Sequence, residues 1–326
     1  AAYYAPTARK RSVHNRKGLY MTDNGIKRIC VSVSNLARST AFFVEEMELE
    51  KVCSGSMNME DVRKMYGLDN CKADYVMLKN DEQPTLLQLI EFSEKSGRCS
   101  RDGRPSWDYG YYDVAFRTKD NAREKERFEE LGYGYYCPPT RYVADWIGLD
   151  VLEAVLKGPD SMPMALIERL REPIPKFDGR FSIFTDCAIT VGDAEEATRF
   201  YADTLGMKKI FDQVLPDGLV DEIVSVPAGT HTRMLMYSGG NTPITECLEY
   251  SLKGRPMCDV AKPENAGIFA VAYETEDIHA LLKKAEVNGF KTLREAVEIS
   301  MEPYGKILTA LINGPSDIPV EIYQLI

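Results

Sequence analysis

Apolar and polar residues alternate from Phe184 to Val191, and this alternation predicts a strand. Successive side chains of a strand point to opposite faces, so positions 184, 186, 188 and 190 would share one face. Asp186 is the only charged residue on that face. The strand is therefore predicted to present one carboxylate on an otherwise uncharged face.

A helix is predicted to follow this strand directly. Apolar residues recur at helical spacing between Ala194 and Leu205. Asp193 precedes an acidic first turn, as is typical of an N-cap, and Gly206 ends the pattern. The stretch therefore predicts a strand, a capped helix and a glycine stop in succession.

This strand and helix form one unit of an internal repeat that occurs four times. The copies begin at Gly25, Gly110, Phe181 and Gly267, and each is followed by three further predicted strands. We call each copy with its strands a module. Longer and shorter modules alternate along the chain. The third module is predicted to include a strand at Val220–Val226.

The chain is predicted to consist of two consecutive domains, residues 25–172 and 180–326, after an extension of residues 1–24. Two prolines in the segment 171–179 mark the boundary. In the first module, a polar insert ends at Tyr66. The extension is basic and has no apolar segment, so we interpret it as a surface arm or a contact for a partner.

Composition excludes several classes of partner. The chain has 326 residues, of which 44% are apolar and 28% charged, and its net charge is −10. This balance provides no basic face for nucleic acid or anionic lipid, and no apolar run approaches the roughly 20 residues that span a bilayer. The eight cysteines form no C-x-x-C pair, which favours reduced cysteines in a cytoplasmic protein.

Several strings along the chain resemble the vicinal oxygen chelate superfamily, which includes glyoxalase I, methylmalonyl-CoA epimerase, extradiol dioxygenases and bleomycin-resistance proteins. They are ICVSVSNLARSTAFF, DVAFRTKD, CAITVGDAEEATRFYADTLGM, AVAYETED, GPDSMPMALIE and GPSDIPVEIYQ. The resemblance implies an α+β fold in which four βαβββ modules form two open, strongly curved mixed-sheet barrels. In one arrangement, module one pairs with module two, and module three pairs with module four. In the other arrangement, module one pairs with module four, and module two pairs with module three.

The family's metal ligands come from the first and last strands of each module. The positions that match are Arg28 and Gln88, Asp113 and Ala165, Asp186 and Glu246, and Ala270 and Glu321. Only the two glutamates keep the family's usual carboxylate, and no histidine stands at a first-strand position. The three histidines, His14, His231 and His279, lie elsewhere and are interpreted as solvated or structural. Iron-dependent ring cleavage and zinc-based glyoxalase chemistry are both disfavoured.

The resemblance places Asp186, Glu246 and Glu321 in one cleft of the second domain. Carboxylates that share a cleft repel one another, so either a cation neutralises them or at least one pKa rises. An all-oxygen ligand set favours Mg²⁺, Mn²⁺ or Ca²⁺ over Zn²⁺ or iron. Without a cation, one carboxyl group would act as general acid or base. Tyr323 and Tyr250 lie along the same strand faces and are candidates for substrate contact.

The first domain is predicted to serve as a scaffold. Arg28 and Asp113 would face each other across its cleft as an ion pair, and Ala165 removes a ligand. The alternative pairing of modules would instead group Asp113 with Asp186 and Glu246 in one cleft, and Arg28 with Gln88 and Glu321 in the other.

Three functions stay open. The first is an isomerase, epimerase or lyase that acts through an enolate on an oxygenated small molecule, with or without a divalent cation. The second is a non-catalytic binding protein of the resistance type. The third is an extradiol-type dioxygenase with an altered metal site. Each implies a small-molecule partner, and the resemblance also allows a homodimer.

Overall fold

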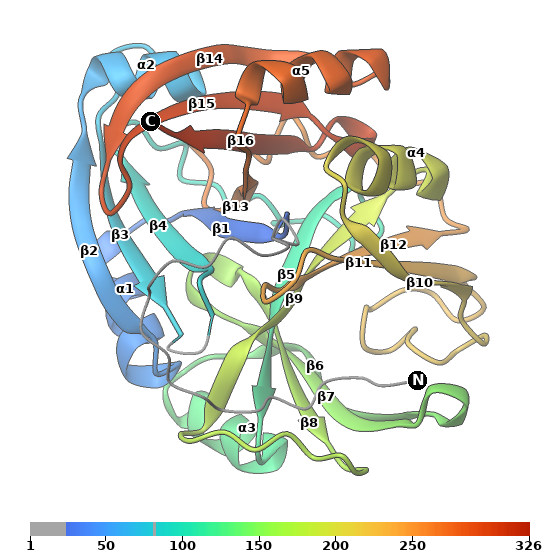
Figure 1. Ribbon diagram of the computed structural model, residues 1–326. Helices are drawn as coiled ribbons and strands as arrows, with labels where there is room; N and C mark the ends of the chain where they lie inside the picture. The colour runs from blue at the N-terminus through green and yellow to red at the C-terminus, as the bar shows by residue number, and fades with distance from the viewer. Residues whose placement is uncertain (1–23, 81–82) are drawn as a thin grey trace, which may run out of the picture.

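The computed structural model describes residues 24–80 and 83–326. The predicted N-terminal extension, including His14, therefore lies outside the described residues except for Asn24. The strands form two sheets of eight strands each, and both sheets are strongly curved (Figure 1). None of the helices in the described ranges combines the length and apolar character that a membrane crossing requires.

One sheet contains the strands of modules one and four, and we call it the Arg28 sheet. In spatial order its strands are β14 (Thr292–Met301), β15 (Gly305–Asn313), β16 (Pro319–Leu325), β13 (Gly267–Glu274), β1 (Ile26–Ser32), β4 (Leu86–Phe92), β3 (Ala73–Lys79) and β2 (Glu50–Met57).

The other sheet contains the strands of modules two and three, and we call it the Asp186 sheet. In spatial order its strands are β10 (Lys208–Val214), β11 (Thr232–Ser238), β12 (Ile244–Tyr250), β9 (Phe181–Val191), β5 (Gly110–Thr118), β8 (Pro163–Arg169), β7 (Leu149–Lys157) and β6 (Tyr135–Ala144).

The modules thus pair one with four and two with three. First strands join the modules, since β1 pairs with β13 and β5 pairs with β9, both antiparallel. Each half of the chain contributes one module to each sheet. The two consecutive domains predicted for residues 25–172 and 180–326 therefore do not correspond to the two sheets.

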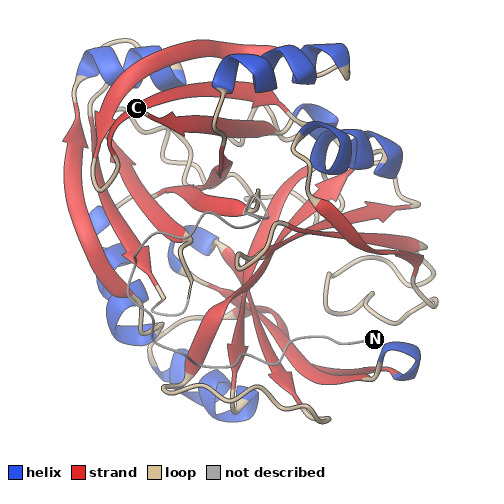
Figure 2. Cartoon of the chain, in the orientation of Figure 1, coloured by secondary structure: helices blue, strands red, loops and turns tan. Residues whose placement is uncertain are grey.

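Among the described residues, five α-helices lie at the periphery of the strands (Figure 2). An Asn or Asp at each N-cap accepts a hydrogen bond from a backbone N–H of the first turn, which satisfies a donor that the helix leaves free. The helices are α1 (Leu36–Ala41), α2 (Met59–Tyr66), α3 (Asn121–Glu130), α4 (Ala194–Thr198) and α5 (Ile278–Val287), with one π turn continuing α1 over Phe42–Glu46 and another continuing α4 over Arg199–Thr204.

The largest hydrophobic cluster lies between the sheets and helices α1, α3, α4 and α5. On each central strand, the apolar residues of this cluster alternate with residues that point to the opposite face of the sheet. Tyr111 of β5 links the two sheets, because its hydroxyl donates to Pro319 O at 2.8 Å and accepts from Val271 N at 3.1 Å. We call the face of each sheet that lies opposite these four helices its inner face.

Candidate functional site

Four carboxyl side chains share the inner face of the Asp186 sheet. They are Asp113 on β5, Glu153 on β7, Asp186 on β9 and Glu246 on β12. Asp186 raises the pKa values of the other three, so the four groups are close enough to interact. The structure therefore gathers carboxyl groups from four different strands and from two modules.

Short side chains lie between these carboxyl groups. Ala115 pairs with Asp186 on one side and with Ala165 on the other, and Ala188 pairs with Glu246. An alanine does not extend far from the sheet, so the longer acidic side chains stand above the alanines. No bulky side chain therefore stands at these paired positions between the carboxyl groups.

Burial and mutual repulsion raise the pKa values of these groups. The pKa of Asp113 lies well above its ordinary value, first because the group is desolvated and then because Asp186 and Glu153 are close. Its Oδ1 atom has no hydrogen-bond partner among the described residues. The pKa of Glu246 is raised well above its ordinary value for the same reasons, with desolvation the largest. Burial also raises the pKa of Asp186.

Glu153 titrates near neutral pH. Burial raises its pKa to about 7, and the charge of Asp186 adds to the shift. Tyr142 donates a hydrogen bond to Glu153 Oε2 at 3.0 Å, and this bond and the charge of Arg117 act in the opposite direction. Near pH 7, Glu153 is therefore present in both its acidic and its basic form.

Sequence reasoning missed Glu153, because the family's ligand positions lie on first and last strands and β7 is neither. A signal was present: a single glutamate interrupts the apolar stretch from Val151 to Leu156. A lone charge on a strand face is a candidate for a buried site. Asp113 was recognised only in the alternative pairing of the modules, which is the pairing that the structure has.

An irregular segment, residues 215–231, covers the inner face of the Asp186 sheet. It packs against Tyr250 of β12 in one hydrophobic cluster. Ile223 of the segment packs against Val155 of β7 in another. Tyr250 lies on the same face of β12 as Glu246, and Val155 lies on the same face of β7 as Glu153. The segment therefore lies over the carboxyl groups, which explains their desolvation.

The predicted strand at Val220–Val226 is wrong. This stretch forms turns, and its valines are buried against the inner face instead of alternating across a sheet. An apolar run is compatible with either outcome until its packing partner is known.

The raised carboxyl pKa values predict that the protein loses stability as pH rises from about 4.5 to about 7. In this range the folded protein keeps the Glu153 proton that the unfolded chain releases, since the pKa rises from 4.5 to about 7. The loss from Glu153 alone is on the order of 3 kcal/mol in the free energy of unfolding. Urea unfolding of wild type and Glu153→Gln at pH 5 and pH 7.5 measures it.

The matched control for this experiment is Glu276→Gln, because Glu276 is an exposed acid. The Glu276→Gln variant should keep the pH dependence of wild type, and Glu153→Gln should lose part of it. Equal pH dependence in all three proteins would show that Glu153 does not carry the predicted shift.

The centre of the Arg28 sheet is closed by a buried ion pair. Arg28 donates from Nη2 to Glu321 Oε1 at 2.5 Å, and both side chains are 0% exposed. Thr309 donates to the same oxygen at 2.9 Å. The rings of Tyr304 and Tyr323 lie 5.3 and 5.4 Å from Arg28 Cζ. A charged pair with these partners fills the space where a substrate would otherwise enter.

Helix α2 covers the inner face of the Arg28 sheet. Val62 and Tyr66 of this helix are buried there, and the Tyr66 ring contacts Phe92 and Phe269. This helix replaces the polar insert predicted from the sequence. It follows β2 as the segment 215–231 follows β10, so both longer modules place their extra residues over an inner face. The Arg28 sheet thus has a packed interior.

Three groupings predicted from the pairing of modules one with two and three with four are wrong, and the alternative pairing placed Arg28 with Glu321 correctly. Glu321 does not meet Asp186 and Glu246, because β16 belongs to the other sheet. Arg28 pairs with Glu321 and not with Asp113. For the same reason Tyr323 lies beside Arg28, away from the carboxyl cluster, and its hydroxyl donates to Glu274 Oε2 at 3.3 Å.

Tyr250 does lie beside the carboxyl cluster. It is 8% exposed, and its hydroxyl has no hydrogen-bond partner among the described residues. Glu246 and Asp113 contribute to the rise of its pKa after desolvation, which is the largest cause. A buried hydroxyl without a partner is a candidate for contact with a ligand.

The described residues do not fit a metal ion as they are arranged. Within residues 24–80 and 83–326, no group of three or more His, Cys, Asp or Glu side chains could hold one. His231 is an exposed residue whose Nδ1 lies 2.8 Å from Asp217 Oδ1, and His279 is exposed on α5. Neither histidine lies with the carboxyl cluster.

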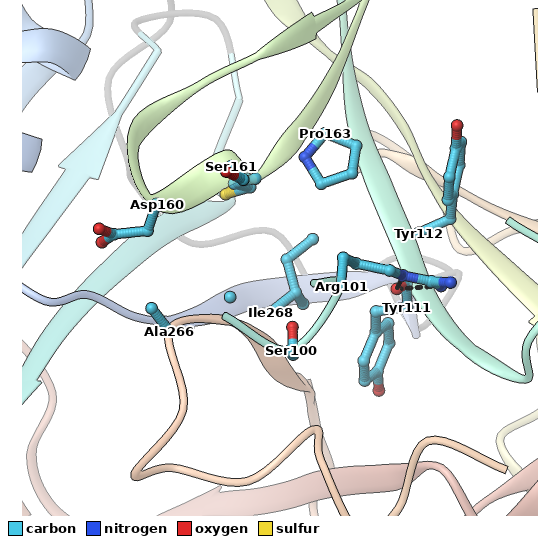
Figure 3. Close-up of a pocket in the computed structure, with 11 residues that line it drawn as sticks. Ser100, Arg101, Tyr111, Tyr112, Asp160, Ser161, Pro163, Ala266 and Ile268 are labelled. Atoms are coloured by element: carbon cyan, nitrogen blue, oxygen red, sulfur yellow. Dashed lines mark hydrogen bonds between the residues drawn. The ribbon is translucent and has the colours of Figure 1, made fainter. Parts of the chain in front are cut away.

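A small cavity lies between the turn at residues 158–163, the start of β13 and the connector that precedes β5 (Figure 3). Its volume of about 10 Å³ is close to that of one water position. Arg101 beside it is committed to backbone carbonyls, including Tyr111 O at 2.6 Å. The cavity is therefore too small to be a substrate site.

Comparison with known proteins places this fold. The family model of the Glyoxalase/Bleomycin resistance protein/Dioxygenase superfamily matches residues 183–322. Glyoxalase I from Zea mays is similar over 92% of both chains, with a TM-score of 0.59 and 18% identity. A putative dioxygenase from Bacillus subtilis subsp. subtilis str. 168 is similar over 92% of this chain and 85% of its own, with a TM-score of 0.56 and 12% identity. No curated protein sequence matches.

Proposed function

We propose that this chain is an enzyme of the vicinal oxygen chelate superfamily and that it moves a proton next to a carbonyl group of a small oxygenated molecule. The reaction class is that of an isomerase, epimerase or lyase acting through an enolate. The observation that carries the proposal is a carboxyl group with a pKa of about 7 among three other carboxyl groups with raised pKa values.

Members of this superfamily typically bind a divalent metal ion. The carboxyl groups of the Asp186 sheet do not form a ligand set as they are arranged. The proposed reaction therefore involves only side chains of the protein.

Glu153 acts as the general base. A base with a pKa near the working pH is partly ionised and still accepts a proton readily, which is the optimum for general base catalysis. Tyr142 holds Glu153 by its hydrogen bond of 3.0 Å and so fixes the orientation of the carboxylate.

Protonated carboxyl groups stabilise the enolate oxygen. Asp113 and Glu246 have pKa values well above their ordinary ones, which favours their protonated forms. A neutral carboxylic acid can donate a hydrogen bond to a developing oxyanion without adding negative charge. The segment 215–231 covers these groups and excludes bulk water, which strengthens such hydrogen bonds.

Deuterium exchange tests this function. The protein is incubated in D₂O with a panel of small ketones, 2-oxo acids and 2-hydroxy acids, and NMR follows loss of the C–H signal next to the carbonyl carbon. We expect catalysed exchange of at least one compound. Its rate should rise through pH 7 as Glu153 ionises.

Binding of a compound without any catalysed exchange would contradict the proposal and would favour a non-catalytic binding protein. A rate that shows no ionisation near pH 7 would remove Glu153 from the role of base.

A further inference from the structure

Arg117 lies in the same row of the sheet as Glu153. It pairs with Ile167 of β8, which pairs with Glu153 of β7. Adjacent strands are about 4.8 Å apart, so the backbones of β5 and β7 lie about 10 Å apart at this row. Both side chains are long enough to approach each other over Ile167. The charge of Arg117 lowers the pKa values of Glu153 and Asp186, which places the guanidinium near both.

Arg117 has no ion pair with any of the described residues, although it is half-buried. Arg169 on β8 is in the same situation, since its guanidinium donates to two backbone carbonyls, Arg171 O at 2.9 Å and Gly148 O at 3.0 Å. The pKa of Arg169 is lowered by desolvation and then by the charges of Arg117 and Arg171. Positive charge therefore accumulates at one end of the carboxyl cluster.

We propose that Arg117 binds the carboxylate of the substrate, so that the substrate of the site is a small organic acid anion. This inference rests on the proposed function and names the substrate class of the same site. A planar guanidinium matches a carboxylate in a bidentate pair. A doubly charged phosphate would meet stronger repulsion from the nearby carboxyl groups than a carboxylate would. The acid's α-carbon would lie above Ile167, between Arg117 and Glu153.

The experiment measures binding without turnover. Isothermal titration compares glycolate, its uncharged analogue glycolamide, and inorganic phosphate on the full-length protein. We expect wild type to bind glycolate more tightly than either of the other two. Arg117→Met should weaken glycolate binding roughly 10- to 100-fold, because a charge-assisted pair is lost. Arg117→Lys should retain part of the affinity, since the charge stays and the planar fork is lost.

Arg294→Met is the matched control, because Arg294 is exposed on β14 of the other sheet. It should bind glycolate like wild type. Circular dichroism establishes that the Arg117 variants are folded, and Arg117→Lys serves as the readout if the methionine variant is not. Three results would each overturn the proposal. They are an unchanged glycolate affinity in both Arg117 variants, tighter binding of phosphate or glycolamide than of glycolate by wild type, and no glycolate binding by wild type.

This outcome is separable from that of the exchange experiment. Glycolate binding that depends on Arg117, in a protein that catalyses no exchange, leaves the anion site in place and removes the enzyme. Catalysed exchange of uncharged ketones alone, with no Arg117-dependent binding, keeps the proposed enzyme and removes the anion site.

Discussion

Replacing Glu153 by Gln is expected to lower the rate of catalysed proton exchange by about 10²- to 10⁴-fold, the range typical for loss of a general base. Glutamine has the shape of glutamate and still accepts a hydrogen bond from Tyr142, so the local packing should persist. Amide nitrogen and oxygen cannot take up the substrate's proton at neutral pH. The exchange assay in D₂O measures the loss, and Glu276→Gln should exchange like wild type.

Variants of two neighbours of Glu153 provide a second test, the position of the pH–rate profile. This profile would not shift if Glu153 had only a structural role. Asp186→Asn removes a negative charge that raises the pKa of Glu153, so the rising limb of the pH–rate profile should move to lower pH. Tyr142→Phe removes a hydrogen bond that lowers this pKa, so the same limb should move to higher pH. An activity of Glu153→Gln within about threefold of wild type would exclude Glu153 as the base.

Replacing Arg28 by Met is expected to destabilise the fold by about 3–5 kcal/mol, because it leaves Glu321 buried without its ion-pair partner. Both side chains are 0% exposed, so no water can replace the guanidinium without a rearrangement. Denaturant unfolding of wild type and the variant measures the loss.

The double variant Arg28→Met with Glu321→Leu should recover most of the lost stability, because apolar residues can replace a buried ion pair at little cost. Arg294→Met should stay within about 0.5 kcal/mol of wild type, as is usual for exposed positions. A cost below about 1 kcal/mol for Arg28→Met would show that the Arg28 sheet does not depend on this pair.

These two experiments also separate the roles of the two sheets. Arg28 and Glu321 lie in the sheet whose inner face is filled by α2, whereas Glu153 lies in the sheet covered by the irregular segment 215–231. A folded Arg28→Met protein should therefore keep its exchange activity.

Local pattern predicted much of the architecture. The helix predicted at Ala194–Leu205 is formed as α4 and a π turn that ends at Thr204, and Asp193 caps it as expected. The strand predicted at Phe184–Val191 lies within β9. Alternation also made Asp186 the only charge on its strand face, and that face is the inner one, but a bulge between Asp186 and Phe184 turns Phe184 to the opposite face, against Phe116. These features depend on neighbours within a few residues, so they can be predicted from the sequence.

The sequence by itself thus determined the four modules, their caps and the strand faces that carry Asp186 and Glu246. Only the tertiary structure decided which modules share a sheet, because the edge of a first strand offers the same backbone hydrogen bonds to either partner. That choice moved Glu321 to Arg28 and brought Asp113 and Glu153 to Asp186. The desolvation that raises the pKa of Glu153 depends on residues brought over it from a distant segment, and no local pattern contains that information.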